Sequence, residues 1–294
     1  METWFWILGW SLSLLTIAGN GFIIFLVCSK RQLRTKTNAF VVSLAVADFC
    51  VGISVVPPMF FCEMATGCKQ QLYGIDNELR LFFSYASAMN MCGLVIDRYI
   101  AVVKPFKYLI FMRRRRVIQM VCLPWAIPVA QRIVFYLTFF ILKKTHFWDF
   151  LFWVTVIFFE LLPCFILIVS FAFMLQVLCK HQRAARTRAR QLRFNHYRVS
   201  FKIQEKSAVK IMAIVIAVFL LCYGFYVRCS LIFIFKIGEC NDEEYKIPLL
   251  VLNSAINPAA YAFFKRDIKK EIKRPLCCAI VNQIEPVDNA NYIL

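Results

Sequence analysis

The chain has 294 residues and a formal net charge of +18, from 35 Lys and Arg against 17 Asp and Glu. Hydrophobic residues make up 61% of it and charged residues 18%, whereas soluble domains hold about 45–50% apolar and about 25% charged residues. This composition excludes a disordered chain, because disorder requires low hydrophobicity, and it argues against a soluble globule. An apolar chain with strong basic charge is typical of a membrane protein with basic cytoplasmic loops.

Seven apolar runs follow one another along the chain. A hydrocarbon core about 30 Å thick needs about 20 apolar residues in a helix, and the backbone groups of that helix must pair within it. The predicted spans are Trp4–Cys28, Ala39–Cys62, Leu81–Ile96, Val117–Leu142, Phe150–Cys179, Ile211–Phe235 and Ile247–Phe264. We therefore expect an all-α membrane protein in which residues 1–264 form a bundle of seven transmembrane helices.

The basic residues are distributed unevenly between the two sides of these spans. Of the 35 Lys and Arg, 27 lie after the first, third, fifth and seventh spans. Loops on the cytoplasmic side of membrane proteins carry such an excess. The charges therefore predict an extracellular N-terminus and a cytoplasmic C-terminus, and they support the count of seven.

Residues 265–294 are predicted to form a cytoplasmic helix and tail. Phe264, Ile268 and Ile272 recur every four residues among Lys and Arg, which is typical of a short amphipathic helix lying along a membrane. Two adjacent cysteines come next, Cys277 and Cys278. They are candidates for palmitoylation, the alternative being unmodified thiols.

Most spans carry a short motif of polar, aromatic or proline residues. Polar groups inside lipid are costly and usually functional. In chain order the motifs are Gly19-Asn20, Leu44-Ala45-Val46-Ala47-Asp48, Asp97-Arg98-Tyr99, Trp125, Pro163 and Asn257-Pro258-Ala259-Ala260-Tyr261. This ordered set, which covers almost the whole chain, resembles the rhodopsin-like class of G-protein-coupled receptors.

The resemblance implies a plasma-membrane receptor that passes the signal of an extracellular small molecule or short peptide to heterotrimeric G proteins, without enzymatic chemistry. A constitutively active or decoy receptor of the same fold is one alternative. A small membrane transporter is another, although transporters typically show a repeat symmetry that this chain lacks. The ten Lys and Arg between Lys180 and Lys210 would lie near anionic lipid and the G protein rather than bind nucleic acid.

The resemblance also implies an activation switch near the cytoplasmic side. Its residues are Asp97, Arg98, Tyr99, Glu205, Asn257, Pro258 and Tyr261. In the family, a Glu fourteen residues before the sixth-helix Phe pairs with the Arg in the resting state, and these two residues are Glu205 and Phe219 here. The alternative is that Glu205 is a solvated residue in a charged loop.

A second set of polar residues is expected around Asp48, in the middle of the membrane. A lone carboxylate there must be neutral, paired or bound to a cation. The family's sodium pocket uses an Asp, a Ser and two Asn, which match Asp48, Ser87, Asn253 and Asn257. Oxygen donors around a carboxylate suit a hard cation. We expect an allosteric sodium ion and no other cofactor, the alternative being a protonated Asp48 in a hydrogen-bonded polar core.

The sixth span and the cysteines depart from the family pattern. The family usually has Cys-Trp-x-Pro in the sixth span, whereas this chain has Cys222-Tyr223-Gly224-Phe225 and lacks the proline. The usual disulfide at the start of the third helix cannot form, because Tyr73 occupies the expected position. A Cys62–Cys68 or a Cys229–Cys240 disulfide on the outer side is possible, and the sequence alone cannot decide which cysteines are bonded.

The residue at position 80 indicates the charge of the ligand. Amine receptors place an Asp seventeen residues before the Asp of the third-helix motif, and Arg80 stands there. Guanidinium groups recognise carboxylates and phosphates in a fork geometry. We hypothesise a ligand with an anionic group bound by Arg80 and Arg228, in a pocket that also holds Glu160 and Tyr223. The alternative is that Arg80 or Arg228 pairs with Glu160 and leaves an apolar pocket.

Overall fold

The computed structural model of the chain describes residues 2–64, 70–138, 145–191, 198–238, 240, 243–265 and 267–272. The regular elements in this range are helices, and no strand occurs in it. The longer ones are α1 (Thr3–Ser29), α2 (Lys36–Ser54), α3 (Val56–Met64), α4 (Gln70–Val103), α5 (Pro105–Phe111), α6 (Arg114–Leu137), α7 (Thr145–Val156), α8 (Leu162–Gln191), α9 (Arg198–Phe235) and α10 (Glu243–Phe264). Shorter turns are the 3-10 helix η1 (Arg31–Leu33), the π-helical turn η3 (Ile157–Leu161) and a helix at 267–272.

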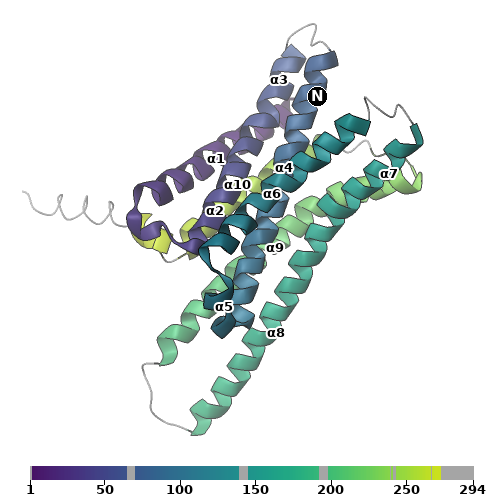
Figure 1. The fold of residues 1–294 in the computed structure, drawn as a ribbon. Helices are drawn as coiled ribbons and strands as arrows, with labels where there is room; N and C mark the ends of the chain where they lie inside the picture. The colour runs from purple at the N-terminus through teal and green to yellow at the C-terminus, as the bar shows by residue number, and fades with distance from the viewer. Residues whose placement is uncertain are drawn as a thin grey trace, which may run out of the picture.

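In the described part of the chain these helices make seven rods, the number of spans predicted, and Figure 1 shows them gathered into a bundle. α2 and α3 form one rod interrupted at Val55, two residues before Pro57, whose ring cannot continue the helical hydrogen bonding. α7, η3 and α8 form another. Six rods in the described part of the chain are long and apolar enough to cross a membrane. The seventh, α10, carries several polar residues that lower its hydropathy, and it packs against α1, α2 and α9.

The third rod is longer than its apolar run. Leu81–Ile96 is the shortest of the predicted spans, but α4 runs for 34 residues and packs against α2, α6 and α8. Its polar ends extend the helix beyond the hydrophobic stretch, and hydropathy alone does not detect them. α4 therefore reaches from one end of the bundle to the Asp97-Arg98-Tyr99 motif near the other end.

The interior of the bundle holds one large apolar cluster and one smaller one. Leu44, Val95 and Phe219 are among the fully buried residues of the large cluster, which joins α2, α4 and α9. The smaller cluster is formed by Phe5, Val51, Val55, Val56, Ile247 and Val251. Ile268, from the predicted amphipathic stretch, is completely buried and Ile272 packs beside it, so the helix at 267–272 is attached to the large cluster.

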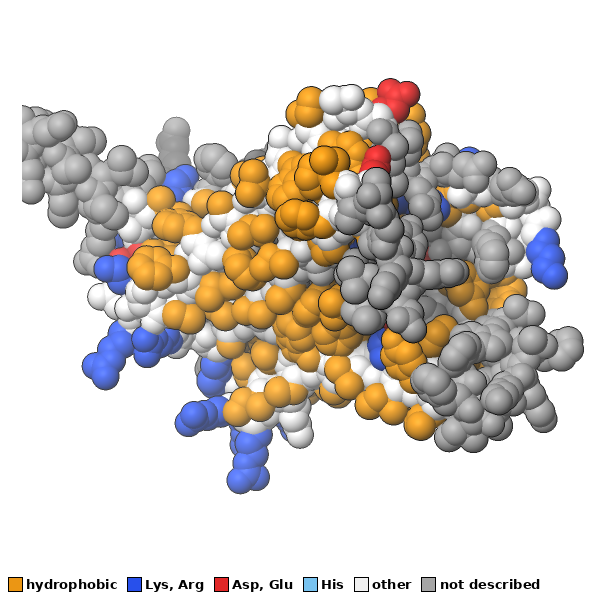
Figure 2. Space-filling model, turned by 90° about the horizontal axis from the view of Figure 1, so that it is seen from above, with side chains coloured by type: hydrophobic (Ala, Val, Ile, Leu, Met, Phe, Trp, Pro, Cys, Tyr) orange, Lys and Arg blue, Asp and Glu red, His pale blue; other side chains and the backbone are white. Residues whose placement is uncertain are grey.

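Large apolar side chains cover the outside of the bundle. Ile7, Phe25, Phe165 and Leu221 are each more than 60% exposed. Figure 2 shows hydrophobic side chains spread across the face in view, while most of the Lys and Arg side chains in view gather towards its left. An exposed apolar surface of this extent would promote association in water, and it suits contact with lipid.

Gly52 allows α1 and α2 to approach closely, as small residues do between membrane helices. The Ser13 hydroxyl donates to the Gly52 carbonyl oxygen. A Cβ at Gly52 would lie 2.9 Å from Ile17 Cγ1 and 3.3 Å from the Ser13 carbonyl oxygen. Gly52→Leu is expected to lower the thermal midpoint of the purified protein by several degrees, because overpacking costs about 1–3 kcal/mol.

The matched control for this prediction is Gly224→Leu. A Cβ at Gly224 would meet nothing within 4 Å, so the added side chain needs no rearrangement and the midpoint should not fall. Equal losses in the two variants would contradict a specific close contact at Gly52.

Candidate functional site

A cavity of about 1050 Å³ opens between the helix ends that lie opposite the Asp97-Arg98-Tyr99 motif. Its walls come from the first half of α4, the start of α10, the last residues of α6, the last third of α9, and α7 with η3. Aromatic rings from Tyr85, Phe135, Trp153 and Tyr226 line it. Its charged residues are Glu78, Arg80, Arg132, Glu160, Lys236 and Lys246.

Two arginines of the cavity already have partners. Arg132 Nη1 lies 2.6 Å from Glu78 Oε2, and the two side chains form an ion pair between α6 and α4. The Arg80 guanidinium donates to Asn77 Oδ1 over 2.5 Å. The partner of Arg80 is thus Asn77 and not Glu160, which removes one of the two pairings, Arg80 or Arg228 with Glu160, in the alternative of an apolar pocket.

The four residues predicted to bind ligand do not all reach the cavity. Arg80 and Glu160 line it, whereas Arg228 and Tyr223 are not among its lining residues. Arg228 is exposed. Tyr223 is buried and stacks on Phe219, with ring centroids 4.5 Å apart. The register of α9 places Tyr226, one turn further along, in the cavity wall instead.

Three aromatic residues of α9 connect the cavity with the apolar core. The Tyr226 ring lies 6.1 Å from the Tyr223 ring, which in turn stacks on Phe219. Phe219 is fully buried in the large cluster. A change in the cavity wall at Tyr226 can therefore be transmitted by direct contact to the middle of α9.

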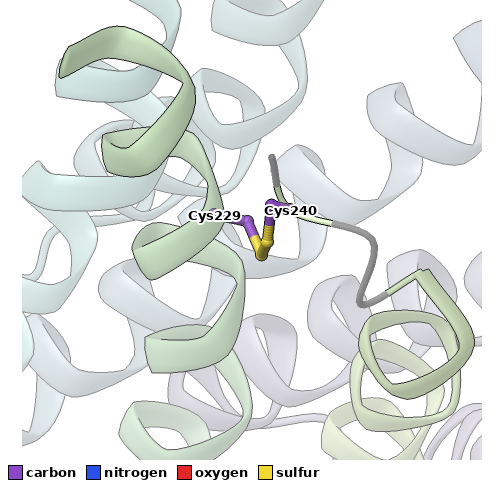
Figure 3. The surroundings of a disulfide bond; sticks show 2 residues. All are labelled: Cys229 and Cys240. Atoms are coloured by element: carbon purple, nitrogen blue, oxygen red, sulfur yellow. A yellow bond between two sulfur atoms is a disulfide. The ribbon is translucent and has the colours of Figure 1, made fainter. Parts of the chain in front are cut away.

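A disulfide closes the rim of the cavity. Cys229 of α9 is bonded to Cys240 in the following segment, with Cα atoms 5.5 Å apart (Figure 3). Both cysteines line the cavity, and this result confirms one of the two links that the sequence left open. Cys62 is also disulfide-bonded, while Cys68 lies outside the described residues.

The polar set around Asp48 joins three helices in the middle of the bundle. Asp48 is completely buried. Ser87 donates to Asp48 Oδ1 over 2.6 Å, and Asn257 Nδ2 donates to Oδ2 over 2.8 Å. Asn253 is buried one helical turn before Asn257. The donor set combines one carboxylate with neutral oxygens, which fits a hard monovalent cation in chemistry.

The Asp97-Arg98 motif lies at the other end of α4. Arg98 Nη2 is 3.0 Å from Asp97 Oδ2, and Asp97 is completely buried. Tyr108 of α5 donates its hydroxyl proton to Asp97 Oδ1 over 2.8 Å. The Thr37 hydroxyl oxygen lies 3.3 Å from the Tyr108 hydroxyl oxygen. Burial raises the pKa of the Tyr108 phenol above its usual value, so the hydroxyl keeps the proton that it donates. The predicted partner of Arg98, the Glu205 side chain, lies outside the described residues.

The other predicted switch residues lie near this motif or on α10. Tyr99 contacts Phe173 of α8, with ring centroids 6.2 Å apart. Tyr261 is buried, and Pro258 packs against Gly19, where a Cβ would lie 3.0 Å from the proline ring. The candidate lipidation sites lie outside the described residues; they are Cys277 and Cys278.

Sequence reasoning missed a polar junction at Asn38, at the start of α2. Asn38 Nδ2 donates to the Leu33 carbonyl oxygen over 2.7 Å and to Asp267 Oδ2 over 3.2 Å. The Lys265 ammonium donates to Asn38 Oδ1. Asn38 is completely buried, so it ties the first loop to the segment that follows α10. No motif marks this junction, because its members are distant in the chain.

A comparison with protein families identifies the family of this chain. The family model described as the seven-transmembrane receptor of the rhodopsin family matches residues 19–261. The chain belongs to this family. It is therefore a G-protein-coupled receptor embedded in a membrane by several spans, and not an enzyme.

Several receptors of known type are similar to this receptor. The octopamine receptor beta-2R of Chilo suppressalis is 27% identical, over 90% of this chain and 78% of that protein. The histamine H2 receptor of Homo sapiens is 26% identical, over 92% of this chain and 79% of that protein. The dopamine D2-like receptor of Drosophila melanogaster is 38% identical, but over 40% of this chain and 13% of that protein.

The Asn38 junction makes the stability of this receptor depend on pH. Burial lowers the pKa of Lys265 to about 8 from 10.5. Between these two values the unfolded chain binds more protons than the folded receptor, so stability increases as the pH rises through this window. The thermal midpoint of the wild type relative to Lys265→Met is expected to rise from pH 8 to pH 10. Parallel pH profiles of the two proteins would contradict this.

Proposed function

We propose that this receptor works in the plasma membrane, with its N-terminus outside, and binds a small extracellular ligand in the cavity described above. The supporting observation is the cavity itself, which lies at the helix ends away from the basic loops. Its volume of about 1050 Å³ is in the range of pockets that hold small organic molecules. The Cys229–Cys240 disulfide at its rim is consistent with an oxidising exterior.

The class of ligand is narrowed by the cavity and by the relatives. The receptors for octopamine and histamine are named for small amines, which favours a ligand with an amino group. The hypothesis of an anionic ligand keeps Arg80 but not Arg228, which does not line the cavity. Two carboxylates, Glu78 and Glu160, share the same cavity and would repel an anion.

Signal transfer would run along α9 towards the G protein. A ligand against Tyr226 shifts the stacked pair Tyr223 and Phe219, and outward movement of α9 opens the cytoplasmic side around Arg98. The ligand favours this state only if it binds that state more tightly than the resting one. A sodium ion at Asp48 would favour the resting state, and the basic loops would contact anionic lipid.

The test is a second-messenger assay of tagged receptor in cells, screened against amines, carboxylates, nucleotides, lipids and peptides. We expect a response to a small molecule that disappears in Arg98→Ala at equal surface expression. An N-terminal tag should be detected on intact cells, and a C-terminal tag only after permeabilisation. Tags on the same side, or a response that survives Arg98→Ala, would contradict the proposal.

A further inference from the structure

Three buried polar atoms in the cavity have no hydrogen-bond partner among the described residues. They are Glu160 Oε2, Gln131 Oε1 and Arg132 Nε. Buried polar groups in folded proteins are almost always paired, and an unpaired carboxylate oxygen is among the most costly to bury. Glu160 Oε2 and Gln131 Oε1 are acceptors, so a bound molecule with N–H groups can supply their missing partners, whereas Arg132 Nε is itself a donor.

Glu160 is the most unusual of the three residues. Its side chain is only 2% exposed, and it lies on the π-helical turn η3, three residues before Pro163. Such turns are frequent at functional sites. The Ser230 hydroxyl is a hydrogen-bond partner of its carboxylate, and Lys246 acts on it electrostatically. Among the described residues, however, no Lys or Arg nitrogen is in ion-pair distance of Glu160.

The surroundings of Glu160 suit a cation attached to a flat ring. Tyr85 stacks on Phe159, the neighbour of Glu160, with ring centroids 4.6 Å apart. Tyr85 and Tyr226 both line the cavity, and aromatic faces attract ammonium groups. The unpaired Gln131 Oε1 adds a second acceptor in the same cavity. These groups together can accept the several N–H donors of one ammonium.

We propose that Glu160 is the counter-ion for the ammonium group of a small aromatic amine. This inference rests on the proposed function, since it names the ligand class for the same cavity. The usual orientation of an amine, with its ammonium group against the third helix, is blocked here because Arg80 would repel it. The ligand is therefore bound in the reverse direction, with its charged end against the fifth rod.

The first test needs no ligand and uses the thermal midpoint of the purified full-length receptor. Because one oxygen of the Glu160 carboxylate, Oε2, lacks a partner in the free receptor, Glu160→Gln is expected to raise the midpoint by about 2–4 °C. Glu78→Gln is the matched control, a carboxylate of the same cavity that is already paired with Arg132, and it should lower the midpoint. A lower midpoint for Glu160→Gln would show a structural ion pair and overturn the proposal.

The second test uses probes that share a ring and differ in charge. Tyramine, tyrosine and 3-(4-hydroxyphenyl)propionate form one set, and histamine, histidine and 3-(imidazolyl)propionate form another. At millimolar concentration, at least one of the two amines should stabilise the wild type and trigger Arg98-dependent signalling. Its potency should fall by about tenfold to a hundredfold in Glu160→Gln, with partial retention in Glu160→Asp.

The outcomes separate this proposal from the proposed function. No stabilisation by either amine, stabilisation by the acids alone, or equal amine potency in Glu160→Gln would overturn the role of Glu160. An Arg98-dependent response to an acid would do so while leaving the receptor function intact. The absence of a response to any class in the wider screen would count against the proposed function itself.

Discussion

Asp97→Asn is expected to raise ligand-independent signalling about tenfold or more. The carboxylate is completely buried, pairs with Arg98 at 3.0 Å and accepts the Tyr108 hydroxyl at 2.8 Å. Hydrogen bonds to charged groups contribute about 1.5–3 kcal/mol, and each 1.4 kcal/mol changes an equilibrium about tenfold. Because the active state of a two-state protein is typically about 0.1–10% populated, loss of this restraint should be visible in a second-messenger assay without ligand.

Two further variants separate the contributions at this motif. Tyr108→Phe removes one neutral donor and leaves the ion pair, so its basal signalling should rise by a smaller factor than that of Asp97→Asn. Under the proposed activation route, Arg98→Ala should remove signalling altogether, because this route frees the Arg98 guanidinium to engage the G protein. Unchanged basal activity of Asp97→Asn at equal surface expression would show that the ion pair at 3.0 Å does not restrain the receptor.

The number of spans could be predicted from the sequence because the bilayer imposes a strong rule. Every backbone group in lipid must pair within a helix. The length of the apolar runs and the charge of the loops are therefore nearly sufficient to predict the number of spans. The same rule says little about where helices end outside lipid. This is why α4 begins at Gln70 and not near Leu81, and why the π-helical turn at Glu160 was not foreseen.

The polar residues inside the bundle were predicted better than the lining of the cavity. Asp48, Ser87 and Asn257 belong to local motifs, and the structure brings them into hydrogen bonds. Whether a residue of α9 faces the cavity depends on how that helix is rotated by packing. Tyr223 lies in the core, whereas Tyr226 lines the cavity. The two residues are three positions apart, and hydrophobic periodicity alone could not tell which of them faces the cavity.

Single hydrogen bonds between different helices were the least accessible to sequence reasoning. Tyr108 reaches Asp97 from α5, and Trp125 donates to Ser43, which donates to Asn90. Each is a single hydrogen bond between distant or non-periodic positions, and it leaves no pattern in the composition. The sequence therefore identified Asp97 and the polar residues around Asp48, but not Tyr108, the neutral side chain that bonds to Asp97.

Asp48→Asn is expected to abolish a sodium-specific stabilisation of the free receptor. In sodium chloride, the thermal midpoint of the wild type should exceed that in potassium chloride at the same ionic strength, because a ligand at ten times its Kd contributes about 1.4 kcal/mol. Asparagine keeps the size of the side chain and can still bond to Ser87 and Asn257, but it lacks the charge that attracts the cation. Basal signalling should fall on adding sodium in the wild type and stay constant in the variant.

Ser87→Ala is the graded control for the sodium prediction, since it removes one oxygen donor and leaves the carboxylate that bonds to Asn257 at 2.8 Å. The difference between sodium and potassium should shrink in this variant without vanishing. A wild type that responds identically to the two salts would instead indicate a protonated Asp48, satisfied by Ser87 and Asn257 alone. A full sodium effect retained in Asp48→Asn would place the cation elsewhere in the receptor. Either result would leave Asp48 as a hydrogen-bonding residue of the core, because a carboxylate in the middle of the membrane that binds no cation must be neutral or paired.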